Sequence, residues 1–165
     1  MKFSGFQRFT QFRDDDSGSG VLEFALAAIV LLTIIFGVMD ASRAMYADHY
    51  VSNAAREATR YAMVRGQDFS GTSCATAASY SCMATSADIT NFVNSITPLG
   101  FTANNLSVAS SWSGTALNGS VCTASNPAQG CVVNVQVSYT FNFVLPFLPK
   151  NSMVLSSTSG VTVLQ

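Results

Sequence analysis

The chain has 165 residues, a formal net charge of −1 at pH 7 and a single histidine. Its 8 lysine and arginine residues are balanced by 9 acidic ones, so it cannot build the basic stripe that nucleic-acid binding requires, and nucleic acid is excluded as a partner. After residue 66, side-chain charge is confined to Asp68, Asp88 and Lys150, and the sequence has no phosphate-binding glycine loop, so we predict no catalytic residue, metal site or cofactor.

An apolar run near the N-terminus covers residues 21–39. As a helix it would be roughly 28 Å long, which is enough to cross the core of a bilayer. The apolar part of a secretory signal is shorter, and no Ala-x-Ala cleavage site interrupts this run before Asp40. A buried core helix is the remaining alternative, but the chain before residue 89 has few large aliphatic residues to cover it. We therefore predict a membrane-embedded helix over residues 19–40.

A single carboxylate, Glu23, lies just inside the apolar run, where an unpaired charge is costly. It is followed by Phe24, and a cut after Gly18 would make Ser19 the first residue and Glu23 the fifth. This arrangement resembles the class III signal of the pilin family, in which prepilin peptidases cut after a glycine. In the Flp and TadE-like branches of that family an aromatic residue follows the glutamate. The resemblance implies a leader over residues 1–18, whereas a cut after Gly20 would put Glu23 at the third position and fits the family poorly.

Removal of the leader would leave an ammonium group on Ser19. Glu23 of the same or a neighbouring subunit could pair with it in a low-dielectric environment, because a well-placed partner offsets the cost of a buried charge. The resemblance also implies the partners: a prepilin peptidase, other pilin or pseudopilin subunits through the stem helix, an inner-membrane assembly platform and membrane lipid.

The basic residues on the two sides of the apolar run favour a cytoplasmic N-terminus only weakly. Lys2, Arg8 and Arg13 precede the run, but Arg43 and Arg56 follow it. An acidic patch at residues 14–16 departs from the usual basic leader. The resemblance implies a single-pass protein of the bacterial inner membrane, with its C-terminal domain in the periplasm and possible incorporation in an extracellular pilus.

The helical pattern continues past the apolar run to about Arg65, and no glycine or proline interrupts it before Gly66. Apolar and small residues recur there at helical spacing: Tyr50, Ala54, Ala58, Tyr61 and Ala62. We therefore predict an amphipathic continuation of the stem over residues 41–66. His49 adjoins Asp48 on this helix, but adjacent helical residues point about 100° apart, so the two form no catalytic dyad.

Residues 51–62 resemble the helix that follows the membrane span in TadE-like proteins. Those proteins are small pseudopilin-like components of tight-adherence (Flp) pilus systems. The residues that carry this resemblance are Asn53, Arg56, Arg60 and Tyr61. An ordinary solvated helix face is the alternative for Arg56 and Arg60.

Four cysteines, Cys74, Cys82, Cys122 and Cys131, all follow the stem. An even number in a chain rich in Ser, Thr, Asn and Gly favours disulfides in an oxidising compartment such as a bacterial periplasm. Three connectivities are open, and we favour Cys74–Cys82 and Cys122–Cys131 because each would close a short polar loop. A zinc site is the alternative, but these spacings do not resemble those of zinc knuckles.

The remaining sequence, residues 67–165, is typical of a small α+β domain linked by disulfides. Ile89, Phe92, Val93 and Ile96 recur at helical spacing and predict a short helix over residues 87–96. Residues 131–143 alternate strictly between apolar and polar, and shorter alternations cover residues 106–112 and 153–164. One-sided alternation predicts an antiparallel sheet with one face buried against the helices. The predicted fold is α+β, with a long pilin-like membrane helix before this sheet.

Two functions follow from these patterns. The first is a TadE-like minor pilin or pseudopilin, cut after Gly18, that acts in assembly of a tight-adherence (Flp) type IV pilus or a related secretion filament. The alternative is an uncleaved, single-pass anchored binding module that presents its β domain outside the cytoplasm. Cleavage and self-association distinguish the two, and both predict a protein that is not an enzyme.

Overall fold

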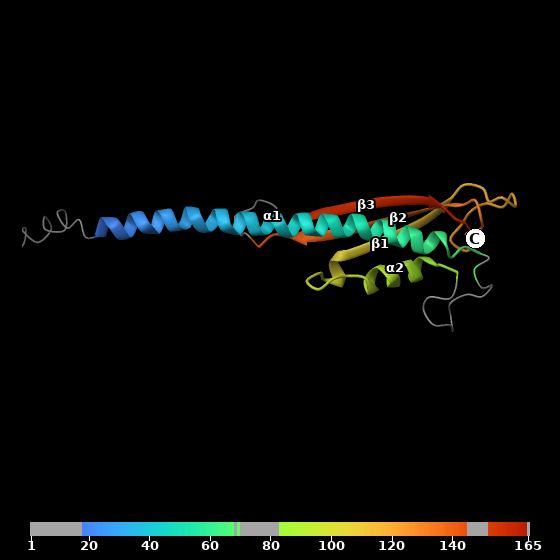
Figure 1. Cartoon of the computed structure of the whole chain (residues 1–165), viewed down its shortest axis with the longest axis horizontal. Coiled ribbons are helices and arrows are strands. Elements are labelled where there is room, and N and C mark those ends of the chain that lie inside the picture. Colours follow the sequence, from blue (N-terminus) through green and yellow to red (C-terminus); the bar gives the residue numbers. More distant parts are fainter. Residues whose placement is uncertain (1–17, 68, 70–82, 145–151, 165) are drawn as a thin grey trace, which may run out of the picture. The chain divides into compact units, whose positions relative to one another are not determined.

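The computed structural model describes residues 18–67, 69, 83–144 and 152–164 of the chain. In chain order its elements are α1 (Ser19–Met63), α2 (Ser86–Ser95), the 3₁₀ turn η3 (Ala103–Asn105), β1 (Leu106–Ser113), β2 (Val132–Asn142) and β3 (Ser152–Thr162) (Figure 1). A long apolar helix followed by a three-stranded antiparallel sheet and a short helix confirms the predicted α+β class. The chain divides into two compact units, Met1–Ser42 and Arg43–Gln165, and α1 contributes to both.

Helix α1 begins at Ser19 and ends at Met63, about two residues before the predicted end. It stops there because the backbone beyond it bonds to other segments: Gln67 N–H donates to the carbonyl of Pro127 (3.0 Å), and Arg65 accepts from Ala84 (2.9 Å). Within the second unit, one side of α1 is buried at helical spacing. This side comprises Ala47, Val51, Ala54, Ala55, Ala58, Tyr61 and Ala62. Most of these side chains are small, which lets the helix approach its neighbours closely.

The sheet has the order β1-β2-β3, with both pairs antiparallel. Val133 on the central strand lies opposite Trp112 of β1 and Val161 of β3. The alternation read from the sequence of β2 is confirmed, since every second residue is buried: Val133, Val135, Val137, Tyr139 and Phe141. This buried face is the one that the helices cover.

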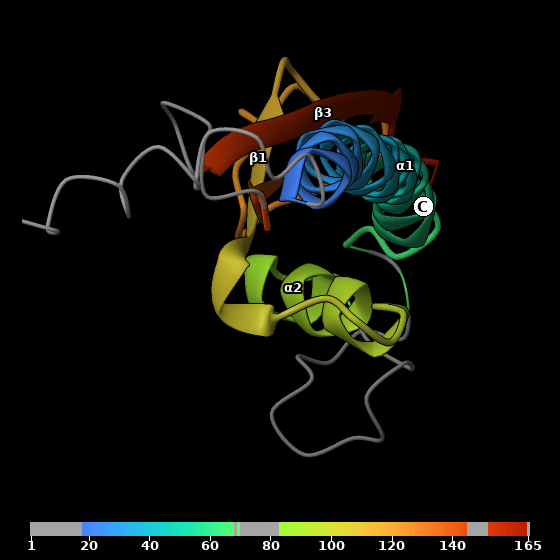
Figure 2. The ribbon, with the colours of Figure 1, turned by 90° about the vertical axis from the view of Figure 1, so that its left-hand side faces the viewer.

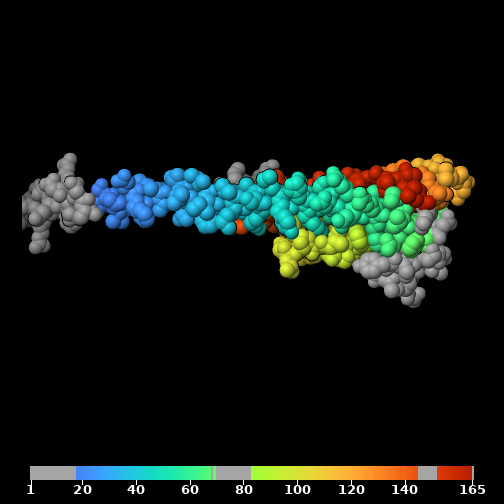
Figure 3. All heavy atoms as spheres, in the orientation of Figure 1, coloured from blue at the N-terminus to red at the C-terminus, as the bar shows by residue number. Residues whose placement is uncertain are grey.

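Both helices of the second unit lie on the same side of the sheet (Figure 2). The C-terminal part of α1 lies beside β3, where the Thr59 hydroxyl is 2.7 Å from its own helix carbonyl at Ala55 and 3.2 Å from the carbonyl of Ser159. Helix α2 contacts β1. The space-filling view shows α2 and the C-terminal part of α1 side by side (Figure 3).

Helix α2 begins at Ser86, one residue before the predicted start, because Thr85 caps it. The Thr85 side chain accepts from the Asp88 N–H, and the Asp88 carboxylate accepts from the Thr85 N–H, which is a capping box. Its apolar side buries Ile89 and Val93 completely. The helix is thus fixed at its start by local hydrogen bonds and along its length by packing.

The loop between β1 and β2 ends in a β-bulge that sets where β2 starts. Gly130 N–H donates to the carbonyl of Val163 (3.1 Å), and Val163 N–H donates to the carbonyl of Cys131 (2.7 Å), so two residues oppose one. Gly130 has a φ of +93°, which favours glycine at the first bulge position. Strand β2 therefore begins at Val132, one residue later than the alternation predicted.

Candidate functional site

The predicted processing site coincides with the start of α1. Gly18 lies in a 3₁₀ turn directly before Ser19, the first α-helical residue, and both are exposed. A Cβ atom at Gly18 would meet nothing within 4 Å, and Gly18 is not among the glycines with positive φ. Neither packing nor backbone conformation therefore requires glycine at this position. Glycine is not required at Gly20 either. The choice of Gly18 over Gly20 as the residue before the predicted cut therefore still depends on the position of Glu23.

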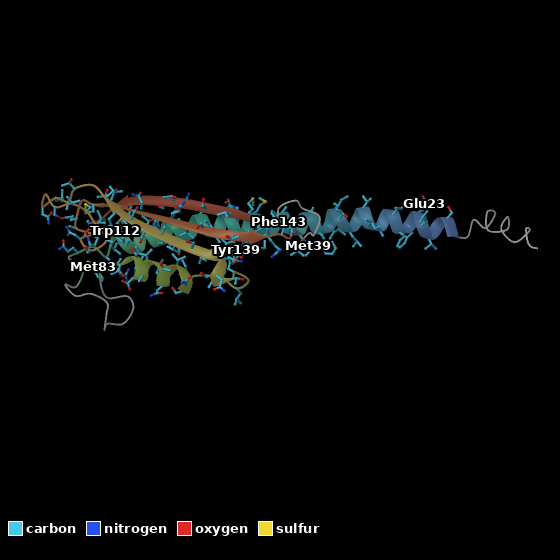
Figure 4. All side chains as sticks on the ribbon, turned by 180° about the vertical axis from the view of Figure 1, so that it is seen from behind. Glu23, Met39, Met83, Trp112, Tyr139 and Phe143 are labelled. Carbon is cyan, nitrogen blue, oxygen red and sulfur yellow. A yellow bond between two sulfur atoms is a disulfide. The ribbon has the colours of Figure 1, made fainter. Side chains whose placement is uncertain are left out.

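Glu23 and Phe24 are both exposed on the first turns of α1, and Phe24 is 74% exposed. Figure 4 shows Glu23 close to the N-terminal end of the helix. Ser19 and Glu23 are four residues apart, so their side chains share one helix face with Cβ atoms roughly 5–6 Å apart. An ammonium group at Ser19 would thus lie within one turn of the Glu23 carboxylate.

Helix α1 is the one helix in the described residues that is long and apolar enough to cross a membrane, and none of its most apolar window is buried. Its large apolar side chains are exposed along the whole run: Val21, Leu22, Phe24, Leu26, Ile29, Val30, Leu31, Leu32, Ile34, Ile35, Phe36, Val38 and Met39. A surface this apolar is stable only when lipid or other apolar side chains cover it. It indicates a single-pass membrane anchor near the N-terminus.

The structure separates the four residues predicted to form the stem motif. Asn53, Arg56 and Arg60 are exposed and follow one line along α1, at positions i, i+3 and i+7. Tyr61 instead is buried and stacks on Phe92 of α2, with ring centroids 4.5 Å apart. The three polar residues are therefore accessible to a partner, whereas Tyr61 holds α1 against α2.

Residues 18–60 match the family model described as TadE-like protein. Over these residues the chain is similar to TadE-like proteins, and we call residues 18–60 the TadE-like segment. The match starts at Gly18 and ends at Arg60, so the TadE-like segment contains the apolar part of α1 and the exposed line of Asn53, Arg56 and Arg60. No curated protein and no solved structure matches the chain. The TadE-like segment and the apolar helix near the N-terminus fit a pilin-like protein.

One of the two predicted disulfides lies within the described residues and is confirmed. Cys122 and Cys131 are bonded, with their Cα atoms 5.6 Å apart and a sequence separation of 9. Both are buried, so the bridge belongs to the core beside β2. Cys74 and Cys82 lie outside the described residues. In residues 18–67, 69, 83–144 and 152–164 no group of three His, Cys, Asp or Glu side chains could hold a metal ion.

The sequence analysis missed an aromatic cluster between α1 and the sheet. At its centre is Phe101, whose ring centroid lies 4.6 Å from Tyr50, 4.8 Å from Tyr139 and 5.8 Å from Tyr46. The alternation of β2 placed Tyr139 on the buried face, but nothing around Phe101 signals that it packs there. Only the packing of α1 and of the turn before η3 against the sheet brings these residues together.

Tyr50 also makes a polar contact inside this cluster. Its hydroxyl lies 2.8 Å from Thr97 Oγ1, and Thr97 donates its own proton to the carbonyl of Val93, so Tyr50 is the donor. Burial raises the pKa of Tyr50 above its ordinary value of 10.0, and the charge of Glu57 acts in the same direction. Tyr50 is therefore neutral at physiological pH and ties α1 to the end of α2.

Proposed function

We propose that this chain is a TadE-like minor pilin or pseudopilin, processed by a prepilin peptidase after Gly18. It acts in assembly of a tight-adherence (Flp) type IV pilus or a related secretion filament. The observation that carries this proposal is that the TadE-like segment starts at Gly18 and contains the apolar, exposed part of α1 together with Glu23. Cleavage at this point would release a subunit that begins with the α-helical residue Ser19.

The geometry at the start of α1 supports a role in subunit assembly. Cleavage creates an ammonium group on Ser19, one helical turn from Glu23. In a low-dielectric environment each charge needs a partner, either within the subunit or from a neighbouring stem. A pair between neighbours fixes how far one stem can slide past the next. The uncovered apolar side chains of α1 pack first against lipid and then against the stems of other subunits.

The proposed location is the bacterial inner membrane, with Arg43–Gln165 in the periplasm. The Cys122–Cys131 bridge supports this side of the membrane, because disulfides persist in oxidising compartments. Besides the prepilin peptidase, the proposed partners are other pilin or pseudopilin subunits and an inner-membrane assembly platform. The exposed Asn53, Arg56 and Arg60 are the polar residues of the TadE-like segment that can contact such partners.

The decisive experiment is N-terminal sequencing and intact-mass measurement of the protein recovered from its native membrane. The expected result is a chain that starts at Ser19 and has lost residues 1–18. An intact Met1 start in cells with an active prepilin peptidase would refute processing. The uncleaved, anchored binding module would then be the better description.

The assembly role is tested by Glu23→Ala. We expect the leader to be removed as before, while incorporation of the protein into filaments, or filament formation itself, is lost. Glu23→Gln should fail in the same way, because it keeps the size of the side chain but removes its charge. Glu57→Ala is the matched control, since Glu57 is an exposed glutamate of the same helix outside the apolar run. Normal piliation by the Glu23→Ala strain would contradict the proposal.

A further inference from the structure

Among the described residues of the second unit, the most exposed large apolar side chain lies at the tip of a tight turn. Leu99 is 100% exposed. The turn is closed by a hydrogen bond from Phe101 N–H to the Pro98 carbonyl (3.4 Å), and Gly100 has a φ of +98°. Pro98 at the first position and Gly100, with its positive φ, at the third position are compatible with a type II turn. The second residue of this turn is Leu99, whose side chain points outward. The Leu99 side chain therefore extends away from the unit, and no described part of the chain covers it.

The turn is fixed to the rest of the unit. Phe101, the residue that closes it, is the centre of the aromatic cluster with Tyr46, Tyr50 and Tyr139. Leu99 itself borders a hollow of about 210 Å³ that Arg43 and Tyr46 also line. Tyr46 is 55% exposed at this hollow. We call Leu99, Arg43 and Tyr46 the docking end of the unit.

The docking end must lie near the bilayer if the apolar part of α1 crosses it. Arg43 follows Met39, the last residue of the apolar run, by four residues. Four residues reach at most about 14 Å even when fully extended, and in a helix they rise only about 6 Å. The polar layer on each side of the hydrocarbon core is itself about 5–8 Å thick. Arg43 therefore lies at or just beyond the headgroups, whichever way the unit turns.

The three side chains of the docking end match the chemistry of a phospholipid surface. Tyrosine is enriched at membrane interfaces, where its ring faces the acyl chains and its hydroxyl faces water. An arginine guanidinium suits the headgroup phosphate, and its side chain near the end of a span can extend to the interface. A fully exposed leucine beside the same hollow as Arg43 can reach the acyl chains when this end of the unit faces the bilayer. We propose that the unit Arg43–Gln165 docks on the bilayer through this end and inserts Leu99 among the lipids.

This proposal depends on membrane insertion of α1 and does not depend on cleavage or filament assembly. It gives the unassembled subunit a fixed orientation on the membrane. A neighbouring subunit is the alternative cover for Leu99, and the experiment below separates it from lipid.

The test is quenching of tryptophan fluorescence by brominated acyl chains. The full chain carrying Leu99→Trp is placed in vesicles of phosphatidylethanolamine and phosphatidylglycerol, at a low ratio of protein to lipid. The matched control is Leu117→Trp. Leu117 is also exposed, at 77%, but follows β1 at the end of the sheet opposite Tyr139. Trp112 stays in both variants as an internal reference, because it is 9% exposed and lies far from Tyr139 and Phe143 (Figure 4).

Brominated lipid is expected to remove about half of the emission of the Leu99→Trp chain, because one of its two tryptophans lies among the acyl chains. The emission of that tryptophan should also shift to shorter wavelength. The unsubstituted chain and the Leu117→Trp chain should lose little emission. The quenching should not depend on the ratio of protein to lipid.

Three results would overturn the proposal. Weak quenching of Leu99→Trp, equal to that of the control, would mean that the docking end stays in water. Equal, strong quenching of both variants would mean that the unit lies on the membrane without a preferred end. A blue shift that grows with protein density and without quenching would mean that another copy of the chain covers Leu99.

Discussion

The bridge between Cys122 and Cys131 should contribute a large part of the stability of the second unit. Its half-cystines are 9 residues apart, so it closes a loop of about ten residues in the unfolded chain. The chain entropy lost by closing such a loop corresponds to about 2.7 kcal/mol at 25 °C. Both half-cystines are buried, so alanine at these positions also loses packing. We expect Cys122→Ala/Cys131→Ala to lower the free energy of unfolding by about 3 kcal/mol, against a usual total of about 5–15 kcal/mol.

The assay is urea unfolding of the full chain in detergent micelles, followed by Trp112 fluorescence. Trp112 suits this purpose because it is buried and lies opposite Val133, two residues after Cys131. The control is the Cys74→Ala/Cys82→Ala chain, measured with and without dithiothreitol. Reduction should then break only the Cys122–Cys131 bridge and reproduce most of the loss without a change in packing volume. A reduced control that unfolds within about 1 kcal/mol of the oxidised one would refute the loop-closure reasoning.

Two further predictions concern the bulge and the aromatic cluster. Gly130→Ala should destabilise the unit by about 1–2 kcal/mol or more. Gly130 has a φ of +93°, and a Cβ atom at this position would lie 3.1 Å from Leu117. An unchanged midpoint of urea unfolding would contradict this prediction. Tyr50→Phe should cost about 1 kcal/mol at neutral pH, because it removes the hydrogen bond to Thr97. The pKa of Tyr50 is raised above 10.0 in the folded chain, so the neutral form stabilises the fold fully below that pH, and this contribution falls as the pH rises towards the folded-state pKa. The difference in unfolding free energy between the unsubstituted chain and Tyr50→Phe should therefore shrink at alkaline pH. A difference that stays constant or widens would show that the Tyr50 hydroxyl does not stabilise the fold in its neutral form.

Features that depend on neighbouring residues could be predicted from the sequence. The apolar run of α1 is long and unbroken, so its helical state and its membrane affinity follow from local chemistry. The strict alternation of β2 assigned its buried face correctly, because a strand has a period of two residues whatever it packs against. The short helix was placed to within one residue, and the exact start at Ser86 followed from the capping box of Thr85 and Asp88.

Features that join distant residues needed the tertiary structure. Thr59 and Ser159 are 100 residues apart in sequence, and Tyr50 and Thr97 are 47 apart, so no local pattern links either pair. The alternation predicted that β2 starts at residue 131, one residue too early, because apolar periodicity does not reveal a bulge. The bulge at Gly130 ends the regular pairing there.

The same distinction holds for the candidate sites. Gly18, Ser19 and Glu23 lie within six residues of one another, so the sequence alone was enough to predict a processing site and the charge that cleavage would create. The docking end could not be found in this way. Leu99 is one leucine among several in the sequence, and only the turn and the packing of Phe101 against α1 and the sheet leave it fully exposed beside Arg43. Outside a regular strand or helix, the exposure of a side chain is set by contacts between distant segments, and the tertiary structure alone decides those contacts.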